Sequence, residues 1–159
     1  MFFLLLAGCN PKNIQQKTIA ENLADSISKH SDSSYTKPYF TTDFVTATYY
    51  VNRKDTSLSQ VMKDSAGMIR QIIISKKNIR LFYGSYYKNG QLQASLPLDE
   101  FGQYHGTGTF YYEDGCIQSS GNYDHGLKTG TWKVFNEKGK ITATDSYDDN
   151  GNLLPQKAP

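Results

Sequence analysis

The C-terminal half of the chain repeats itself at a spacing of about 24 residues. Residues 110–117 align with residues 134–141 at an offset of 24, with aromatic, acidic, glycine and isoleucine positions in matching places. The same offset relates Gly102 to Gly126. Self-similarity at this period is typical of repeat architectures, in which one unit is too small to bury a core and has to pair or stack with its neighbours.

Weaker copies extend the series in both directions. Residues 86–92 match residues 111–117 at an offset of 25, and a fainter copy at 64–69 lies 23 residues before the matching positions around Gly90. Residues 147–153 echo the segment from Tyr123 to Gly126. The repeats are clearest over residues 80–153, about half of the chain, and fainter copies precede them.

Each unit is typical of a β-hairpin: an aromatic segment, a turn containing glycine, a segment that starts with an aliphatic residue, and a second glycine turn. Asn89-Gly90 is the strongest turn signal, because both residues tolerate positive φ. With 12 Tyr, 8 Phe and 13 Gly, the composition also favours short strands and tight turns. A lone hairpin is marginally stable in water. We therefore predict an all-β fold in which repeated antiparallel hairpins form an extended meander sheet.

The segments before the clearest repeats are β-branched, aromatic or alternating, and turn residues such as Lys54-Asp55 separate them. This pattern predicts further antiparallel hairpins. The expected strands cover residues 46–51, 58–62, 68–74 and 79–83. The predicted hairpin repeat domain spans residues 38–154, and residues 155–159 form a tail.

Residues 10–37 are polar and poor in aromatic residues. Ile19, Leu23 and Ile27 recur every four residues, which predicts a short helix with a narrow apolar stripe. Residues 31–34, Ser-Asp-Ser-Ser, are typical of a flexible spacer. We therefore expect residues 9–37 to be a tether that contains one short helix.

The extreme N-terminus resembles the lipobox of bacterial lipoproteins. An apolar run, residues 2–6, leads into Leu6-Ala7-Gly8-Cys9, although no Lys or Arg precedes the cysteine. The resemblance implies that residues 1–8 are a signal segment that is removed and that Cys9 is lipidated. It places the protein in the cell envelope, and Asn10, rather than Asp, favours the outer membrane. The apolar run is far shorter than the roughly 20 residues needed to span a bilayer.

The hairpin units resemble MORN-repeat-variant proteins, a group that includes the YwqK-type antitoxin-like proteins. The matching pieces are residues 87–92, 121–132 and 137–141. This resemblance implies an interaction scaffold rather than a catalyst. Trp132 keeps the tryptophan expected after Gly-x-x-x-Gly, whereas Gly108 occupies the equivalent place one repeat earlier.

The aromatic residues of the repeats have two interpretations. They can fill the shared core of the paired hairpins, or they can line a surface that binds protein, peptide or glycan. Adjacent residues on a strand face opposite sides, so each Tyr-Tyr pair puts one ring on each face. The candidate interaction residues are Tyr86, Tyr87, Tyr111, Tyr112 and Trp132.

Other chemistries have weaker support. A net charge of +2 does not favour nucleic acid as a partner, and two cysteines are too few for a disulfide framework. His105 and His125 both precede a glycine but stand at different repeat positions, so we expect turn residues and no metal site. We expect no cofactor and no catalytic residues.

Three functions remain open. The first is a lipid-anchored envelope protein whose repeat sheet is a non-catalytic interaction scaffold for an unidentified envelope protein, peptide or glycan. The second is an intracellular YwqK-type antitoxin-like protein binder. The third is an enzyme acting on carbohydrate or peptidoglycan through turn carboxylates such as Asp99-Glu100 and Glu113-Asp114.

Overall fold

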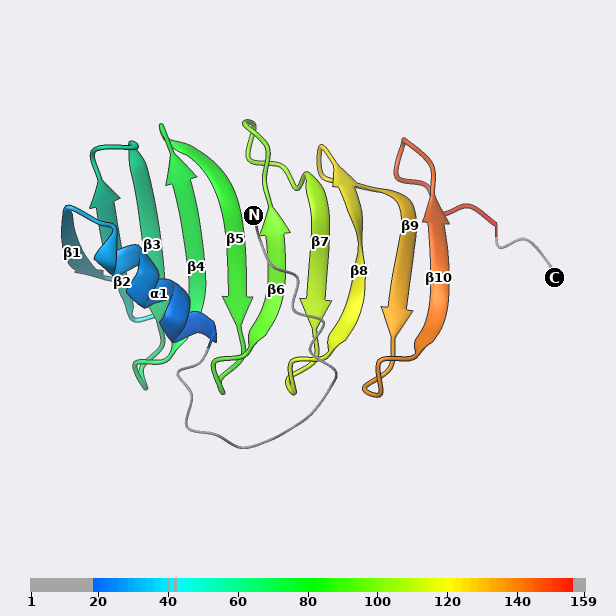
Figure 1. The fold of residues 1–159 in the computed structure, drawn as a ribbon, viewed down its shortest axis with the longest axis horizontal. Helices are drawn as coiled ribbons and strands as arrows, with labels where there is room; N and C mark the ends of the chain where they lie inside the picture. The colour runs from blue at the N-terminus through cyan, green and yellow to red at the C-terminus, as the bar shows by residue number, and fades with distance from the viewer. Residues whose placement is uncertain (1–18, 40, 42, 156–159) are drawn as a thin grey trace.

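The fold is one open antiparallel sheet in which each strand pairs with its neighbours in the chain (Figure 1). The computed structural model describes residues 19–39, 41 and 43–155, so Cys9 and the signal segment at 1–8 lie outside the described residues. The sheet has ten strands in the order β1 to β10, which confirms the predicted meander of hairpins. The strands are β1 Ser33–Pro38, β2 Thr46–Asn52, β3 Ser57–Lys63, β4 Ile69–Lys76, β5 Ile79–Tyr86, β6 Leu92–Pro97, β7 Gly106–Tyr111, β8 Ile117–Asp124, β9 Leu127–Phe135 and β10 Ile141–Tyr147.

One edge of the sheet, the lower edge in Figure 1, carries turns of uniform length at residues 64–68, 87–91, 112–116 and 136–140. All share one hydrogen-bond pattern. In the second of them, Tyr87 N–H donates to the Gln91 carbonyl and Gly90 N–H donates to the Tyr87 carbonyl, both at 2.9 Å. Gly90 has a φ of 79°, which glycine adopts at little cost. The glycine at the fourth position of each of these turns therefore marks this edge. Gly102 and Gly126, the other repeated pair, lie in turns of the opposite edge.

The opposite, upper edge carries turns of several lengths (Figure 1). The shortest turns pair two residues of positive φ, as at Lys77-Asn78 and at His125-Gly126. The longest is the β6–β7 loop, which spans residues 98–105. Pro97 ends β6, and Leu98 N–H donates to the Leu81 carbonyl of β5 at 3.0 Å.

Strand pairing is least extensive between β6 and β7, and we name this boundary the seam. Strands β6 and β7 pair only through Ala94 with Phe110 and Ser95 with Thr109, whereas the other neighbouring strands pair at five or more positions. The seam separates a first half, β1–β6, from a second half, β7–β10.

Helix α1, Ile19–Lys29, lies across the first half of the sheet (Figure 1). The helix predicted from Ile19, Leu23 and Ile27 is confirmed, with Glu21 in its first turn and Lys29 in its last, as the helix dipole favours. Its Ala20 is 1% exposed, and the helix packs on the buried residues Val61, Ile69, Ile72 and Tyr86. The helix is therefore part of the core and not only part of a tether.

The flexible spacer predicted at residues 31–34 is wrong, because β1 begins at Ser33. Asp32 N–H donates to the Val51 carbonyl at 2.8 Å, and the rings of Tyr35 and Tyr49 stack with centroids 5.0 Å apart. The polar composition concealed a strand whose six residues are all exposed. Backbone pairing with β2, rather than burial of apolar side chains, holds this segment.

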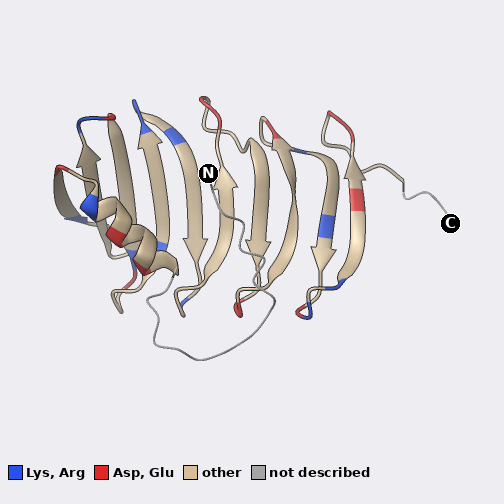
Figure 2. Ribbon diagram, in the orientation of Figure 1, with Lys and Arg blue, Asp and Glu red and all other residues tan. Residues whose placement is uncertain are grey.

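The register assigns each side chain to one of two faces. Cross-strand partners share a face, so Val61 and Ile72 lie on the face that α1 covers, which we name the helix face. Met62 and Gln71 are partners on the other side, which we name the open face. Lys, Arg, Asp and Glu gather mostly in the turns, and the strands carry few of them (Figure 2). Among the described residues, no helix is both long enough and apolar enough to cross a bilayer.

Candidate functional site

The five aromatic residues proposed from the sequence do not form one exposed row. Tyr86 is 1% exposed and Trp132 is 2% exposed, so neither ring is presented to a partner. Tyr87, Tyr111 and Tyr112 are partly buried. This placement fits the interpretation in which the aromatic residues fill the space between hairpins.

The tyrosine hydroxyls tie successive repeats together. Tyr87 Oη donates to the Tyr111 carbonyl at 2.8 Å, and Tyr112 Oη donates to the Phe135 carbonyl at 2.8 Å. Arg70 Nε makes the matching bond one repeat earlier, to the Tyr86 carbonyl at 3.0 Å. Each of these carbonyls therefore receives a side-chain donor from the preceding repeat.

The pKa values of several tyrosines agree with these positions. Burial raises the pKa of Tyr86 to about 12. Burial, followed by the charge of Glu113, raises the pKa of Tyr87 above its usual value. Tyr87 therefore stays protonated at neutral pH and keeps its hydrogen bond to Tyr111.

Trp132 is held on the open face by two contacts. Its Nε1–H donates to the Asn122 carbonyl at 3.0 Å. A Cβ atom placed on Gly121 would lie only 2.3–2.5 Å from the indole ring, so a residue without a side chain is needed there. In the preceding repeat the arrangement is shifted, and the ring of Tyr123 packs over Gly108.

The open face of the second half carries a connected set of rings, of which only Trp132 is among the candidate interaction residues proposed from the sequence. Ring centroids lie 5.3 Å apart between Tyr104 and Tyr123, 5.0 Å between Tyr123 and Trp132, and 6.4 Å between Trp132 and Phe110. Lys128 Nζ lies 4.3 Å from the Trp132 ring centroid, within cation–π range. We name Tyr104, Tyr123, Trp132 and Phe110 the aromatic row.

A groove of about 600 Å³ lies on the same face and meets the aromatic row at Tyr104. Its floor comes from β3, β4 and β5, and the β6–β7 loop forms one wall. Polar lining is provided by Gln60, Gln71, Arg80 and Tyr83. Tyr104, which is 37% exposed, is the ring shared by the row and the groove.

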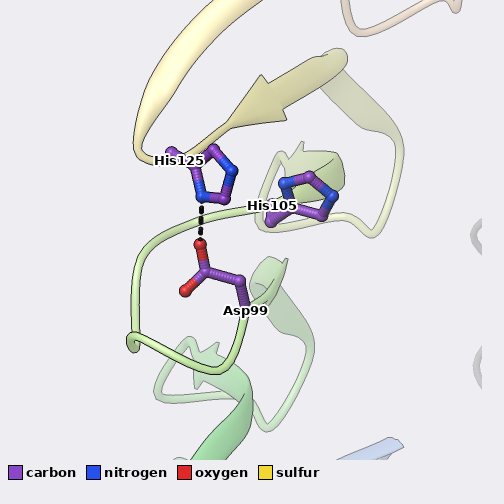
Figure 3. A group of neighbouring side chains, drawn as sticks. All are labelled: Asp99, His105 and His125. Carbon is purple, nitrogen blue, oxygen red and sulfur yellow. Dashed lines mark hydrogen bonds and ion pairs between the residues drawn. The ribbon is translucent and has the colours of Figure 1, made fainter.

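A second candidate site lies on the upper edge, where Asp99, His105 and His125 come together (Figure 3). One nitrogen or oxygen atom from each lies within 4.8 Å of the other two. His125 Nδ1 is 2.7 Å from Asp99 Oδ2, and the two imidazole centroids are 5.2 Å apart. The two histidines stand at unequal repeat positions, but the β6–β7 loop folds toward the β8–β9 turn and brings them into contact.

The local backbone positions this group, which we name the upper-edge cluster. His125 is a turn residue, as predicted from the sequence, and has a positive φ of 44°. Asp99 Oδ1 accepts hydrogen bonds from the N–H groups of Phe101 and Gln103, both at 2.9 Å, so Oδ2 points toward His125. Burial alone would raise the pKa of Asp99, but the bonds from Gln103, His125 and Phe101 outweigh it, and the pKa lies below its usual value.

A comparison with protein families finds the MORN repeat variant twice, at residues 104–125 and 128–149. These two segments cover most of β7–β8 and β9–β10, and the match confirms the predicted repeat type for this part of the chain. No curated protein matches the chain.

Two solved structures are similar in part. One is the crystal structure of accessory secretory protein 1,2 and 3 in Streptococcus pneumoniae, at 12% identity and a TM-score of 0.38 over 82% of this chain. The other is the crystal structure of TarM, at 8% identity and a TM-score of 0.39 over 68% of this chain. The chain spans 23% of the length of each.

Proposed function

Because the chain carries two MORN repeat variants, we propose that it is a non-catalytic binding scaffold anchored to the cell envelope through Cys9. The observation that carries the proposal is the open face, where the aromatic row of the second half meets, at Tyr104, a groove of about 600 Å³ over β3–β5. The partner is a protein that places an extended segment in the groove and against Tyr104, the exposed end of the aromatic row.

The chemistry of the open face supports a protein partner. Interface cores are enriched in Tyr, Trp and Arg and depleted in Lys, Asp and Glu. Tyr104, Tyr83 and Arg80 are of the enriched kind, and the side-chain amides of Gln60 and Gln71 can bond to a peptide backbone. Neighbouring rings restrict the motion of the aromatic row, which lowers the entropy lost on binding.

The proposed anchor fits the position of the fold. Ten residue steps separate Cys9 from Ile19, and a fully extended chain of that length reaches about 35 Å. Lipidation at a lipobox cysteine attaches more than one acyl chain, which is the regime of stable anchoring. The sheet would therefore be held within a few tens of ångströms of the membrane.

The anchor is tested first, by metabolic labelling with a radioactive fatty acid in the native host. The wild type, expressed with its native upstream sequence, is compared with Cys9→Ala. We expect label on the wild type alone, in the outer-membrane fraction. An unlabelled protein in the cytosol would overturn the anchor and favour the antitoxin-like alternative.

The binding face is tested by placing a photo-crosslinking residue at position 104 in cells. Position 35 is the matched control, because Tyr35 is also a partly exposed tyrosine, 46% exposed, but lies on β1. We expect a discrete protein adduct from position 104 and none from position 35. Equal adducts from both positions, or none from either, would contradict a binding site on the open face, and an adduct to glycan would replace the protein partner.

A further inference from the structure

We propose that Asp99, His105 and His125 form a binding site for a divalent transition metal ion of the zinc class (Figure 3). The ion would join the β6–β7 loop to the β8–β9 turn. This proposal is independent of the scaffold function and of the lipid anchor.

The donor atoms suit such an ion. Zinc in proteins binds imidazole nitrogen and carboxylate oxygen at about 2.0–2.2 Å, so the ligand atoms of a tetrahedral site lie about 3.3 Å apart. The three donors here lie within 4.8 Å of one another, and Asp99 Oδ2 and His125 Nδ1 are 2.7 Å apart. Shifts of about 1 Å in exposed side chains would close the group around one ion.

The carboxylate is positioned before any ion binds. The Asp99 side chain is 9% exposed, and its Oδ1 is held by two backbone N–H groups, those of Phe101 and Gln103. The remaining oxygen, Oδ2, is thereby aimed at the imidazole of His125. The two histidine side chains are 50% and 56% exposed, which leaves the rings accessible to an ion from solvent.

A second carboxylate supports the rings. Asp124 Oδ1 lies 3.1 Å from His105 Nδ1 and 3.7 Å from His125 Nε2. Carboxylates behind zinc-binding histidines fix the ring orientation and raise the basicity of the ligand. Two carboxylates with two neutral imidazoles also balance the charge of a divalent ion.

The site lies where the sheet has its fewest strand-pairing contacts. β6 and β7 share two residue pairs. The β6–β7 loop meets the β8–β9 turn through one backbone bond, Gly126 N–H to the Tyr104 carbonyl at 2.8 Å, and through the side-chain hydrogen bond between His125 and Asp99. An ion held by Asp99 and His105 on one side and His125 on the other would replace that single side-chain hydrogen bond with coordination bonds from three residues. We infer that metal binding stiffens the seam between the two halves.

The test is calorimetric titration of the full chain, purified in detergent, with Zn²⁺, together with Co²⁺ titration followed by visible absorption. We expect one equivalent of Zn²⁺ to bind and Co²⁺ to give the absorption of a nitrogen- and oxygen-ligated site. Mg²⁺ should not compete, because imidazole donors do not suit it.

Conservative variants assign the ligands. His125→Asn keeps a residue that tolerates positive φ in the turn, and His105→Gln keeps a polar side chain of similar length. Each should weaken Zn²⁺ binding about tenfold or more. His30→Gln, at a histidine hydrogen-bonded to the Ser26 carbonyl beside α1, is the matched control and should bind like the wild type.

The effect on the seam is measured by hydrogen exchange with and without Zn²⁺. We expect slower exchange at residues 98–105 when the ion is bound, and a higher Tm that a chelator reverses. The proposal is overturned if His105→Gln and His125→Asn bind Zn²⁺ as the wild type does, or if the wild type binds none. It is also overturned if exchange at residues 98–105 does not respond to bound Zn²⁺.

Discussion

The two halves of the sheet share one hairpin plan but hold it together differently. In β1–β6, aliphatic residues such as Val61 and Ile72 are buried under α1, and the core has two layers. In β7–β10, no described helix covers the sheet, and Trp132 and Tyr123 pack over glycines of neighbouring strands. The helix face of the second half carries polar ladders instead, such as the hydrogen bond from Thr107 Oγ1 to Asn122 Oδ1 at 2.8 Å.

This difference explains where the sequence repeat is visible. A helix can cover many combinations of aliphatic residues, so the repeat pattern around Gly67 is free to drift. A hairpin that no helix covers is stabilised by particular residue pairs, such as Trp132 packed on Gly121. It is also stabilised by tyrosine hydrogen bonds to the next repeat, such as that from the Tyr112 hydroxyl to the Phe135 carbonyl. The sequence repeat is therefore clearest in the half of the sheet that no described helix covers.

The strongest test of the comparison is Trp132→Ala. Removing this side chain, which is 2% exposed, should cost about 3–5 kcal/mol. Hydrogen exchange should rise first in β7–β10 and leave β2–β4 protected. Ile141→Ala, at an exposed residue of β10, is the control and should change stability by about 0.5 kcal/mol or less. A uniform rise over both halves would show that they unfold as one unit.

The converse test is Ile72→Ala in the first half. Ile72 is 0% exposed between the sheet and α1, and its loss should cost about 2–5 kcal/mol. We expect exchange to rise in α1 and β3–β5 while the protection of β8–β9 is retained. Leu81→Ala, at a residue of β5 that is 40% exposed, is the comparison variant. Equal losses from the two variants would remove the distinction between a buried core and an exposed strand.

A smaller effect on stability is expected from the tyrosine hydrogen bonds that join successive repeats. Tyr112→Phe removes the hydroxyl that donates to the Phe135 carbonyl, and Tyr87→Phe removes its counterpart one repeat earlier. Each should cost about 1 kcal/mol in urea unfolding. Tyr35→Phe, on the exposed strand β1, serves as the reference. If Tyr112→Phe matches the reference, the hydroxyl ties do not stabilise the second half.

The smallest effect concerns the turns that both halves use. The side chain and then the backbone N–H of Asn152 bond to Asp148 and lower its pKa below the usual 3.8. Because the pKa of Asp148 is lower in the folded chain than in the unfolded chain, its carboxylate stabilises the fold at pH values above the unfolded pKa. This contribution is lost as the pH falls through the folded pKa. Asn136 fills the same turn position without titrating.

Thermal unfolding of the wild type and Asp148→Asn at pH 7 and pH 3 tests this difference. We expect the wild type to lose more stability than the variant on acidification. Identical shifts for the two proteins would mean that the carboxylate does not stabilise its turn.

The meander, its turns and the helix were predictable because each depends on local pattern. Glycine positions, alternation and the spacing of Ile19, Leu23 and Ile27 all report on short stretches of chain. Strand β1 was missed because its residues are polar and its stability comes from pairing with β2. The packing of α1 on the sheet was also missed, because an apolar stripe predicts a helix but does not indicate which surface the helix packs against.

The sites were harder to predict than the fold. The aromatic row joins rings from the β6–β7 loop, β7, β8 and β9, and the upper-edge cluster joins two turns separated by a hairpin. Asp99 and His125 lie 26 positions apart in the chain, and their contact depends on how the β6–β7 loop folds toward the next turn. Such contacts depend on the conformation of the loop, and loop conformation leaves no periodic pattern in the sequence from which it could be predicted.

The contrast between the two edges of the sheet has a consequence for how such a chain can change. From β3 to β10 the lower edge repeats one five-residue turn, so successive hairpins keep matching positions along the sheet. The upper edge already accepts turns from two residues, at Lys77-Asn78, to eight, at residues 98–105. New sequence can therefore be inserted at the upper edge without disturbing the rest of the sheet, which makes that edge the natural place for grafted loops and for divergence between relatives.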